Sequence, residues 1–372
     1  MANEDKATRY NRLRRRASLL GTALTAVWLF VLLASGGSAM LRDFAAGLAR
    51  QSFLLTVVFY VIALGLLSEA VQLPFAFYQG VLLERRYELS TGTTWRWGLD
   101  QLKSTALGLL FAIIGALIVW SLLRSLPQWW WLGAACCFVL LIVVLAHLAP
   151  VLLLPVFYTF TPLDRPALVE RLVALAERAG ARVLGVFEWR LSDRTRKANA
   201  ALTGIGRTRR ILLSDTLLAA HSDDEIEVVL AHELAHHVHH DIWKSIALEA
   251  ALMTLGFYVA DRALAAAVGH FGILAKDDVA AMPVLILAGG AVSLALLPLA
   301  NAVSRAHERR ADRYALEMTK NAAAFSSAMK RLGMQNLAEE HPSRLVEIMF
   351  HSHPSIAARL EAARAWQAAR HG

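Results

Sequence analysis

Long stretches without charged side chains dominate the hydrophobic pattern of this chain. Four of them carry no Asp, Glu, Lys or Arg, and two others carry a single Glu each. A helix needs about 20 mostly apolar residues to cross a membrane, so the pattern predicts six membrane-spanning helices. The first stretch is too long for a signal-peptide core and lacks a small-residue cleavage site, so we expect an anchor. The six stretches are 17–41, 51–83, 104–123, 125–162, 246–260 and 279–304.

Three ionisable residues interrupt these stretches: Glu69, His147 and Glu249. An ionisable side chain inside a span costs about 2.5 kcal/mol or more unless it meets water or a polar partner. A water-filled chamber between the helices would accommodate all three. A hydrogen bond to a neighbouring helix would explain any one of them equally well.

Composition and charge agree with a membrane protein. Hydrophobic residues make up 56% of the 372 residues and the mean hydropathy is +0.45, which excludes an ordinary soluble domain. Lys and Arg near the predicted spans number ten on the side of the N-terminus and five on the other side, which predicts both termini in the cytoplasm. The net charge of +8 then reflects this bias and contact with membrane lipid. Basic and aromatic residues are not interleaved, so no nucleic-acid partner is expected.

An even number of spans places residues 164–244 and 305–372 on the same side of the membrane. The first of these segments predicts a helix at 167–179 and three short strands at 182–189, 198–203 and 210–213. We therefore expect an all-α polytopic membrane protein, about six helices around a chamber, with a cytoplasmic α+β domain. Residues 1–163 would form a membrane domain with four spans. Residues 164–372 would form a second domain that contains spans five (about 245–268) and six (about 280–303).

The most informative motif is His232-Glu233-Leu234-Ala235-His236. Two histidines four residues apart share one helix face and can bind one cation. Zinc is the expected ion, because imidazole suits it. Glu233 is then placed to take a proton from water that the metal activates. A Ser222–Glu225 capping box begins the helix, and no proline follows before Pro283, so the helix is expected to run unbroken into span five.

A third ligand is expected from the segment that follows span six. Glu308 and Asp312 are four residues apart, and a hairpin of spans five and six returns them to the depth of the histidine motif. Glu308 is the favoured ligand, with Asp312 orienting a ligand histidine. Alternatively, the two carboxylates pair with Arg305, Arg309 and Arg310 on a solvated helix. Three further histidines could be spare ligands or ordinary polar residues at the membrane surface: His237, His239 and His240.

Together these motifs resemble the CAAX prenyl protease 1 family, which are zinc proteases of the gluzincin type embedded in membranes. The resemblance covers nearly the whole chain, because further landmarks occur in the family's order. They are Leu73-Pro74-Phe75, Glu84-Arg85-Arg86-Tyr87, Phe160-Thr161-Pro162-Leu163, Asn199-Ala200, Thr203-Gly204, the segment 210–217 and His353-Pro354.

The resemblance implies one zinc ion per chain, bound by His232, His236 and Glu308. It implies that Glu233 is the general base and then acid, that Asp312 holds a ligand histidine, and that His353 stabilises the oxyanion. Asn199 and Ala200 would lie on an edge strand that pairs with an extended peptide or protein substrate. The chain has no room for the additional N-terminal span of eukaryotic members, so it resembles a bacterial member, with its active site on the cytoplasmic side of the inner membrane.

The leading hypothesis is therefore a zinc-dependent membrane endopeptidase. A membrane-protein quality-control protease without CAAX specificity is the alternative within enzymes. A metal transporter is the alternative of a different class, although a transporter has no need of Glu233, which is not a ligand. The sequence does not indicate the oligomeric state.

Overall fold

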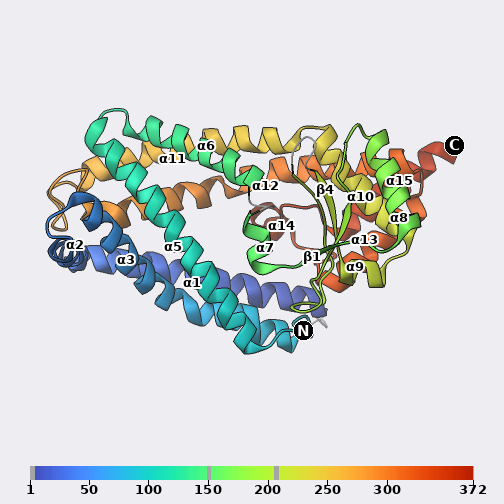
Figure 1. The fold of residues 1–372 in the computed structure, drawn as a ribbon, viewed down its shortest axis with the longest axis horizontal. Helices are drawn as coiled ribbons and strands as arrows, with labels where there is room; N and C mark the ends of the chain where they lie inside the picture. Colours follow the sequence, from blue (N-terminus) through green and yellow to red (C-terminus); the bar gives the residue numbers. More distant parts are fainter. Residues whose placement is uncertain (1–4, 149–151, 205–208, 372) are drawn as a thin grey trace.

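The computed structural model of the chain describes residues 5–148, 152–204 and 209–371. Six long helices follow one another around a ring, and a mixed α/β domain lies at one end of it (Figure 1). Each helix of the ring contacts the next, and the last contacts the first. In ring order they are α1 (Lys6–Ala34), α3 (Phe53–Phe77), α5 (Thr94–Ser125), α6 (Trp130–Leu148), α11 (Asp241–Ala267) and α12 (Met282–Thr319).

Within the described residues, five of these helices are long and apolar enough to cross a membrane. The sixth, α6, matches the fourth predicted stretch but is apolar over a shorter length, residues 130–146. The prediction of six spans therefore corresponds to six ring helices, one of them short. The water-filled chamber stays a prediction.

The structure divides two of the predicted stretches. The first stretch breaks after α1, where Gly36 takes a left-handed conformation (φ 73°) that turns the chain into α2 (Gly37–Leu48). The fourth stretch ends its long helix at Leu148 and later forms α7 (Leu154–Phe157) and strand β1 (Phe160–Pro162). Hydrophobicity alone did not reveal these breaks, because every segment on either side of them is apolar.

The expected α+β domain contains a four-stranded sheet in the order β1-β2-β4-β3. The strands are β1, β2 (Val186–Trp189), β3 (Ala200–Thr203) and β4 (Arg210–Ser214). β2 and β4 are parallel, whereas the outer strands pair antiparallel with them, so β3 forms one edge. Three strands were expected near these positions. β1 was missed because its three residues lie inside an apolar stretch that was interpreted as a span.

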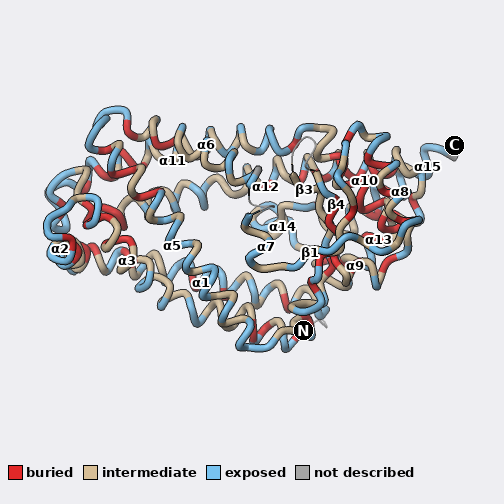
Figure 2. Tube along the Cα trace, viewed as in Figure 1, coloured by how far each residue is buried: buried red, intermediate tan, exposed pale blue. Residues whose placement is uncertain are grey.

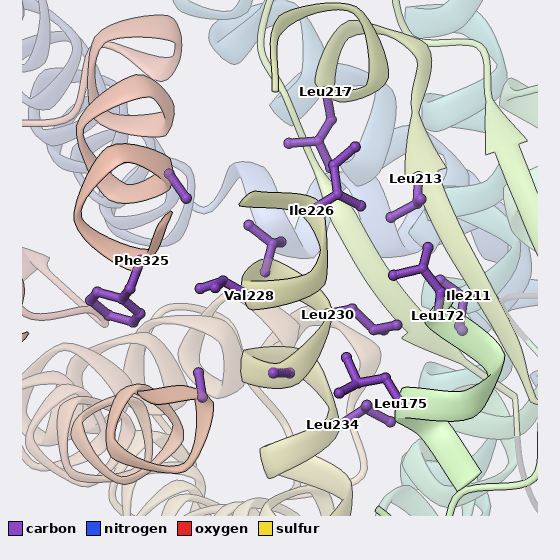
Figure 3. Packing of buried hydrophobic residues seen from close by; sticks show 14 of the residues in the cluster. Leu172, Leu175, Ile211, Leu213, Leu217, Ile226, Val228, Leu230, Leu234 and Phe325 are labelled. Carbon is purple, nitrogen blue, oxygen red and sulfur yellow. The ribbon is translucent and has the colours of Figure 1, made fainter. Parts of the chain in front are cut away.

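Helices that pack on this sheet or on one another complete the domain. They are α8 (Pro166–Arg178), α9 (Asp215–Ala220), α10 (Asp223–Val238), α13 (Ala322–Asn336), α14 (Arg344–Phe350) and α15 (Ile356–His371). Figure 3 shows the core, in which Leu172 and Leu175 of α8, Ile211 and Leu213 of β4 and Phe325 of α13 surround α10. These side chains are almost completely buried, and much of the chain around α8, α10 and β4 is coloured as buried in Figure 2. The core fixes α10, which carries the histidine motif.

The expectation of an unbroken helix from the motif into span five is wrong. α10 ends at Val238, and His240 takes a left-handed conformation (φ 55°) before α11 begins at Asp241. This conformation is uncommon for a residue other than glycine, so sequence propensity did not indicate it. The break brings the first residue of α11, Asp241, back to the histidine motif.

The ionisable residues of the spans have different surroundings. Glu69 of α3 accepts a hydrogen bond of 2.6 Å from Gln101 of α5, so a neighbouring helix supplies a polar partner. Glu249 lines a hollow of about 360 Å³ between α11 and α12. The side chain of His147 lies outside the described residues.

Candidate metal centre and active site

Three side chains from two helices converge at the inner face of the α/β domain. His232 and His236 come from α10 and Glu308 comes from α12, and one ligand atom from each lies within 4.8 Å of the others. Nε2 of His232 is 3.2 Å from Oε2 of Glu308, and Nε2 of His236 is 3.4 Å from Oε1. Ligands about 2.1 Å from a tetrahedral zinc ion are separated by about 3.4 Å, so these distances fit a shared cation.

A buried carboxylate lies behind the first histidine. Oδ1 of Asp312 is 3.0 Å from Nδ1 of His232, on the side of the ring away from Glu308. Arg359 of α15 donates to both oxygens of Asp312, including a bond of 2.9 Å from Nε to Oδ2. The arginine neutralises the carboxylate, and the carboxylate fixes the imidazole.

A second pair of the same kind lies behind His236. Nδ1 of His236 is hydrogen-bonded at 3.0 Å to Oδ2 of Asp241, which is 4% exposed. Arg310 of α12 donates to the other oxygen of Asp241. Sequence reasoning missed Asp241 and Arg359, and it considered Arg310 only as a partner of Glu308 and Asp312. The sequence did offer one signal, an aspartate five residues after His236. This aspartate can reach the histidine only because the helix breaks at His240, and the sequence did not indicate that break.

The surroundings of these groups suit a metal site. Each Nδ1 lies beside a carboxylate, which favours a proton on Nδ1 and would leave Nε2 to a cation. Oε2 of Glu308 is buried between two imidazole nitrogens, 3.2 Å from Nε2 of His232 and 2.8 Å from Nδ1 of His353. A divalent cation between the carboxylate and the two Nε2 atoms would bind all three groups. Two imidazoles and one carboxylate are a ligand set that suits zinc.

Glu233 and His353 lie beside this group. Burial raises the pKa of the Glu233 carboxyl above its ordinary value. Glu233 lines two hollows, one of about 440 Å³ and one of about 500 Å³, so it lies where they meet. Nδ1 of His353 is 2.8 Å from Oε2 of Glu308, and its side chain is 62% exposed.

The two hollows follow the edge strand β3. The first is lined by residues 198–200 together with His353, and the second by Leu202, Thr203 and Gly204. Asn199 directly precedes β3, and its carbonyl accepts a hydrogen bond from the amide of Ser214 in β4. Ala200 is the first residue of β3.

The remaining histidines of the motif region do not join the metal group. Within the part of the chain that the structure describes, His232, His236 and Glu308 are the one set of three ligand-type side chains with metal-site spacing. His239 packs edge-on against the ring of Tyr314, and His237 and His240 line the larger hollow.

Comparisons with known proteins give the family. The model of peptidase family M48 matches residues 162–367, and the model "CAAX prenyl protease N-terminal, five membrane helices" matches residues 2–159. The chain is 32% identical over 360 residues to the "Uncharacterized metalloprotease YhfN" of Bacillus subtilis, which covers 95% of this chain and 84% of that protein. It is 29% identical over 330 residues to the "CAAX prenyl protease 1 homolog" of Arabidopsis thaliana, covering 85% and 75% of the two chains.

The fold is also known from a solved structure. The crystal structure of S. mikatae Ste24p superposes with a TM-score of 0.87 at 22% identity, covering 96% of this chain and 88% of that one. The expected fold class, a polytopic helical membrane protein with an α+β protease domain, is confirmed. The two family models meet between residues 159 and 162, whereas the expected domain division at 163 stays a prediction.

These matches favour a protease over a metal transporter. A transporter requires ligands along a path, whereas the described residues contain one compact group with metal-site spacing, beside Glu233 and a hollow of about 440 Å³. The relatives are named as proteases over most of the chain. The chain belongs to peptidase family M48 and is a membrane metalloprotease that acts on peptides.

Proposed function

We propose that the chain is an endopeptidase with one zinc ion, held by His232, His236 and Glu308. The observation that carries this proposal is the convergence of two Nε2 atoms on one buried carboxylate beside Glu233. Zinc bound there would act as a Lewis acid and make a nucleophile of water at neutral pH.

The side chains around this group have separate roles. Glu233 accepts the proton of the attacking water and passes it to the leaving amine as the peptide bond breaks. Asp312 and Asp241 hold the rings of His232 and His236, each with its arginine. His353, on the loop before α15, donates a hydrogen bond to the oxyanion that forms on the scissile carbonyl. Its exposure leaves room for substrate to reach it.

Substrate is proposed to bind as an extended strand along β3. The hollows on both sides of Glu233 run along this edge, so a peptide paired with β3 passes the catalytic carboxylate. Ala200 contributes backbone groups to this pairing. Asn199, whose carbonyl is already bonded to Ser214, would contribute through its side chain in the smaller hollow.

Two classes of natural substrate fit these features. Relatives carry the name CAAX prenyl protease 1, and a related specificity is proposed here, with quality control of membrane proteins as the alternative. Nothing in the metal group distinguishes the two, because both reactions hydrolyse a peptide bond. The identity of the trapped substrates would decide between them.

The active site is proposed to face the cytoplasm of a bacterial inner membrane. The ten-to-five distribution of basic residues supports this orientation, and anionic lipid would contact the basic side. Cysteines placed at Arg42 and Asp277 should be labelled from outside intact cells, whereas a cysteine at Asp223 should need permeabilised membranes. The reverse pattern would overturn the orientation.

Glu233→Gln tests the mechanism most directly. The variant removes the general base but no metal ligand, so it should keep zinc and fold and lose at least about 10³-fold in kcat/KM. Expressed in native membranes, it should trap substrates whose ends can then be sequenced. Glu227→Gln, on the same helix but paired with Arg171 away from the metal group, is the matched control and should remain active. An active Glu233→Gln enzyme with bound zinc would show that another group is the base.

A further inference from the structure

The edge of β3 has two kinds of backbone position. The pairing register places Ala201 opposite Leu212 and Thr203 opposite Arg210, and the amide of Ser214 donates to the carbonyl of Asn199 at 2.9 Å. Successive residues of a strand turn their N–H and C=O groups to opposite sides. Asn199, Ala201 and Thr203 therefore face β4, and the backbone groups of Ala198, Ala200 and Leu202 face the open edge.

A side chain already occupies the first of these open positions. The N–H of Ala198 donates to Oδ1 of Asn336 at 2.9 Å, and Nδ2 of Asn336 donates to the carbonyl of Ala198 at 3.1 Å. The side-chain amide of Asn336 thus makes the two hydrogen bonds that the backbone of a paired residue would make. A substrate strand cannot make those bonds at Ala198 while Asn336 is in place.

Asn336 is held in this position by its surroundings. It is the last residue of α13, and Leu337 after it takes a left-handed conformation (φ 50°) that turns the chain away. Asn11 of α1 donates to the carbonyl of Leu337 at 2.7 Å, and Gln335 donates to the carbonyl of Arg196 at 2.9 Å. The helix end is therefore tied both to the ring and to the segment that leads into β3.

The hollow continues past this point. Asn336 lines the smaller hollow together with Ala198, Ala200 and Glu233, and that hollow extends to Asn11 and Glu339. Space alone would allow a longer paired strand. The limit at Ala198 comes from occupied hydrogen-bonding groups.

We propose that Asn336 closes the substrate-pairing edge at Ala198 and so fixes which backbone positions of a bound peptide are recognised. Two positions of the substrate, two residues apart, pair with Ala200 and Leu202. A third position, two residues further along, lies beside Ala198 without pairing. This proposal rests on the proposed strand addition and adds to it a residue that determines the register and length of pairing.

The test uses a fluorogenic decapeptide selected for cleavage from a random peptide library. Single N-methyl groups are introduced at each backbone amide in turn, and kcat/KM is measured with the full-length protein in lipid nanodiscs. An N-methyl group removes one hydrogen-bond donor, so each paired position should lose about threefold to tenfold in kcat/KM. The wild-type enzyme should show this loss at two positions, apart from the scissile amide.

Asn336→Ala should free the edge at Ala198 and create a third sensitive position, two residues beyond the first pair. Asn336→Ser should do the same, because its hydroxyl is too short to bond both groups of Ala198, and it provides a second variant if the alanine variant is unstable. Gln335→Ala is the matched control. It removes the hydrogen bond to Arg196 in the same segment but leaves Ala198 covered, so it should keep the wild-type pattern.

The other possible results distinguish a failure of strand addition from a failure of the role of Asn336. A wild-type enzyme insensitive to N-methylation at every position would refute strand addition itself. Two sensitive positions in the wild type that stay unchanged in folded, zinc-bound Asn336 variants would overturn the role of Asn336 and leave strand addition intact. A third position in the Gln335→Ala variant as well would show that loosening of the segment, and not removal of the amide, opens the edge.

Discussion

The ring of long helices and the α/β domain bury their apolar residues to very different extents. In the α/β domain, side chains such as Leu172 and Leu213 are completely buried. In the spans, at most 28% of the most apolar window is buried, and in α11 none of it is (Figure 2). Leu140 of α6 is 64% exposed although its segment is apolar throughout. Lipid solvates such side chains. The ring is therefore apolar along its whole length, although only parts of it form a packed core.

Both regions contain buried acids that basic residues neutralise. Around the metal group, buried acids come with arginines that neutralise them, as in Asp312–Arg359 and Asp241–Arg310. At the far end of the ring, Asp261 bonds Lys276 at 2.5 Å and the indole of Trp130 at 2.7 Å, and Trp130 is completely buried. The ring is thus packed at its far end and at the protease domain. The site is positioned by a dense core, whereas the middle of the ring depends on lipid.

The largest expected effect is the loss of the metal. Replacing His232 and Glu308 together by Ala should abolish zinc binding and peptide cleavage, because one ligand alone remains. Elemental analysis of the purified protein measures this directly. His239→Ala, directly after α10 but outside the metal group, should keep its zinc. Full zinc retention in the double variant would remove these residues from the ligand set.

The difference in burial predicts a difference in stability. Leu172→Ala leaves a cavity in the protease core and should lower the free energy of unfolding by about 2 to 5 kcal/mol. Leu140→Ala changes a side chain that faces lipid and should cost less than about 0.5 kcal/mol. Denaturant unfolding in lipid nanodiscs compares the two. Equal costs would mean that the outer face of α6 packs against another protein.

The carboxylate behind His236 should tune metal affinity. Asp241→Asn keeps the shape of the side chain but weakens its hold on the imidazole, so zinc affinity should fall about 10- to 100-fold. Competition with a chelator gives the affinity. Asp43→Asn, at an exposed acid in the ring, is the control and should leave it unchanged. An unchanged affinity in Asp241→Asn would show that the imidazole is held by packing alone.

The smallest effect concerns acid stability. Burial alone would raise the pKa of Asp215, but hydrogen bonds from the Ser192 hydroxyl and from three backbone amides outweigh it and lower the pKa. A lowered pKa in the folded state stabilises the protein above the unfolded pKa of 3.8, and this stabilisation is lost as the pH falls through the folded value. Asp215→Asn should therefore cost about 1 kcal/mol at neutral pH. Unfolding measured from pH 7 downward should show the difference from wild type shrinking in acid, and a constant difference would contradict this origin.

Sequence reasoning reached the metal group because its signals are local. His232 and His236 are separated by about one helical turn, so they share a face of the helix. The hairpin of spans five and six predicted that Glu308 lies at the same membrane depth as these histidines. The structure brings all three together. Predictions from local patterns failed where the backbone adopts a conformation that its residues do not favour. The left-handed turn at His240 and the three-residue strand at Phe160–Pro162 carry no residue preference strong enough to predict them.

The sequence by itself determined the apolar helices, the mixed protease domain, the histidine motif and the family, because each depends on periodicity or on residues close together in order. Only the tertiary structure decided which basic and amide side chains support the site. Arg359 reaches Asp312 from the last helix, Arg310 of α12 reaches Asp241 at the start of α11, and Asn336 covers Ala198 from 138 residues away. Such contacts depend on how helices dock, and docking is set by the packing of the whole core, which no local pattern encodes.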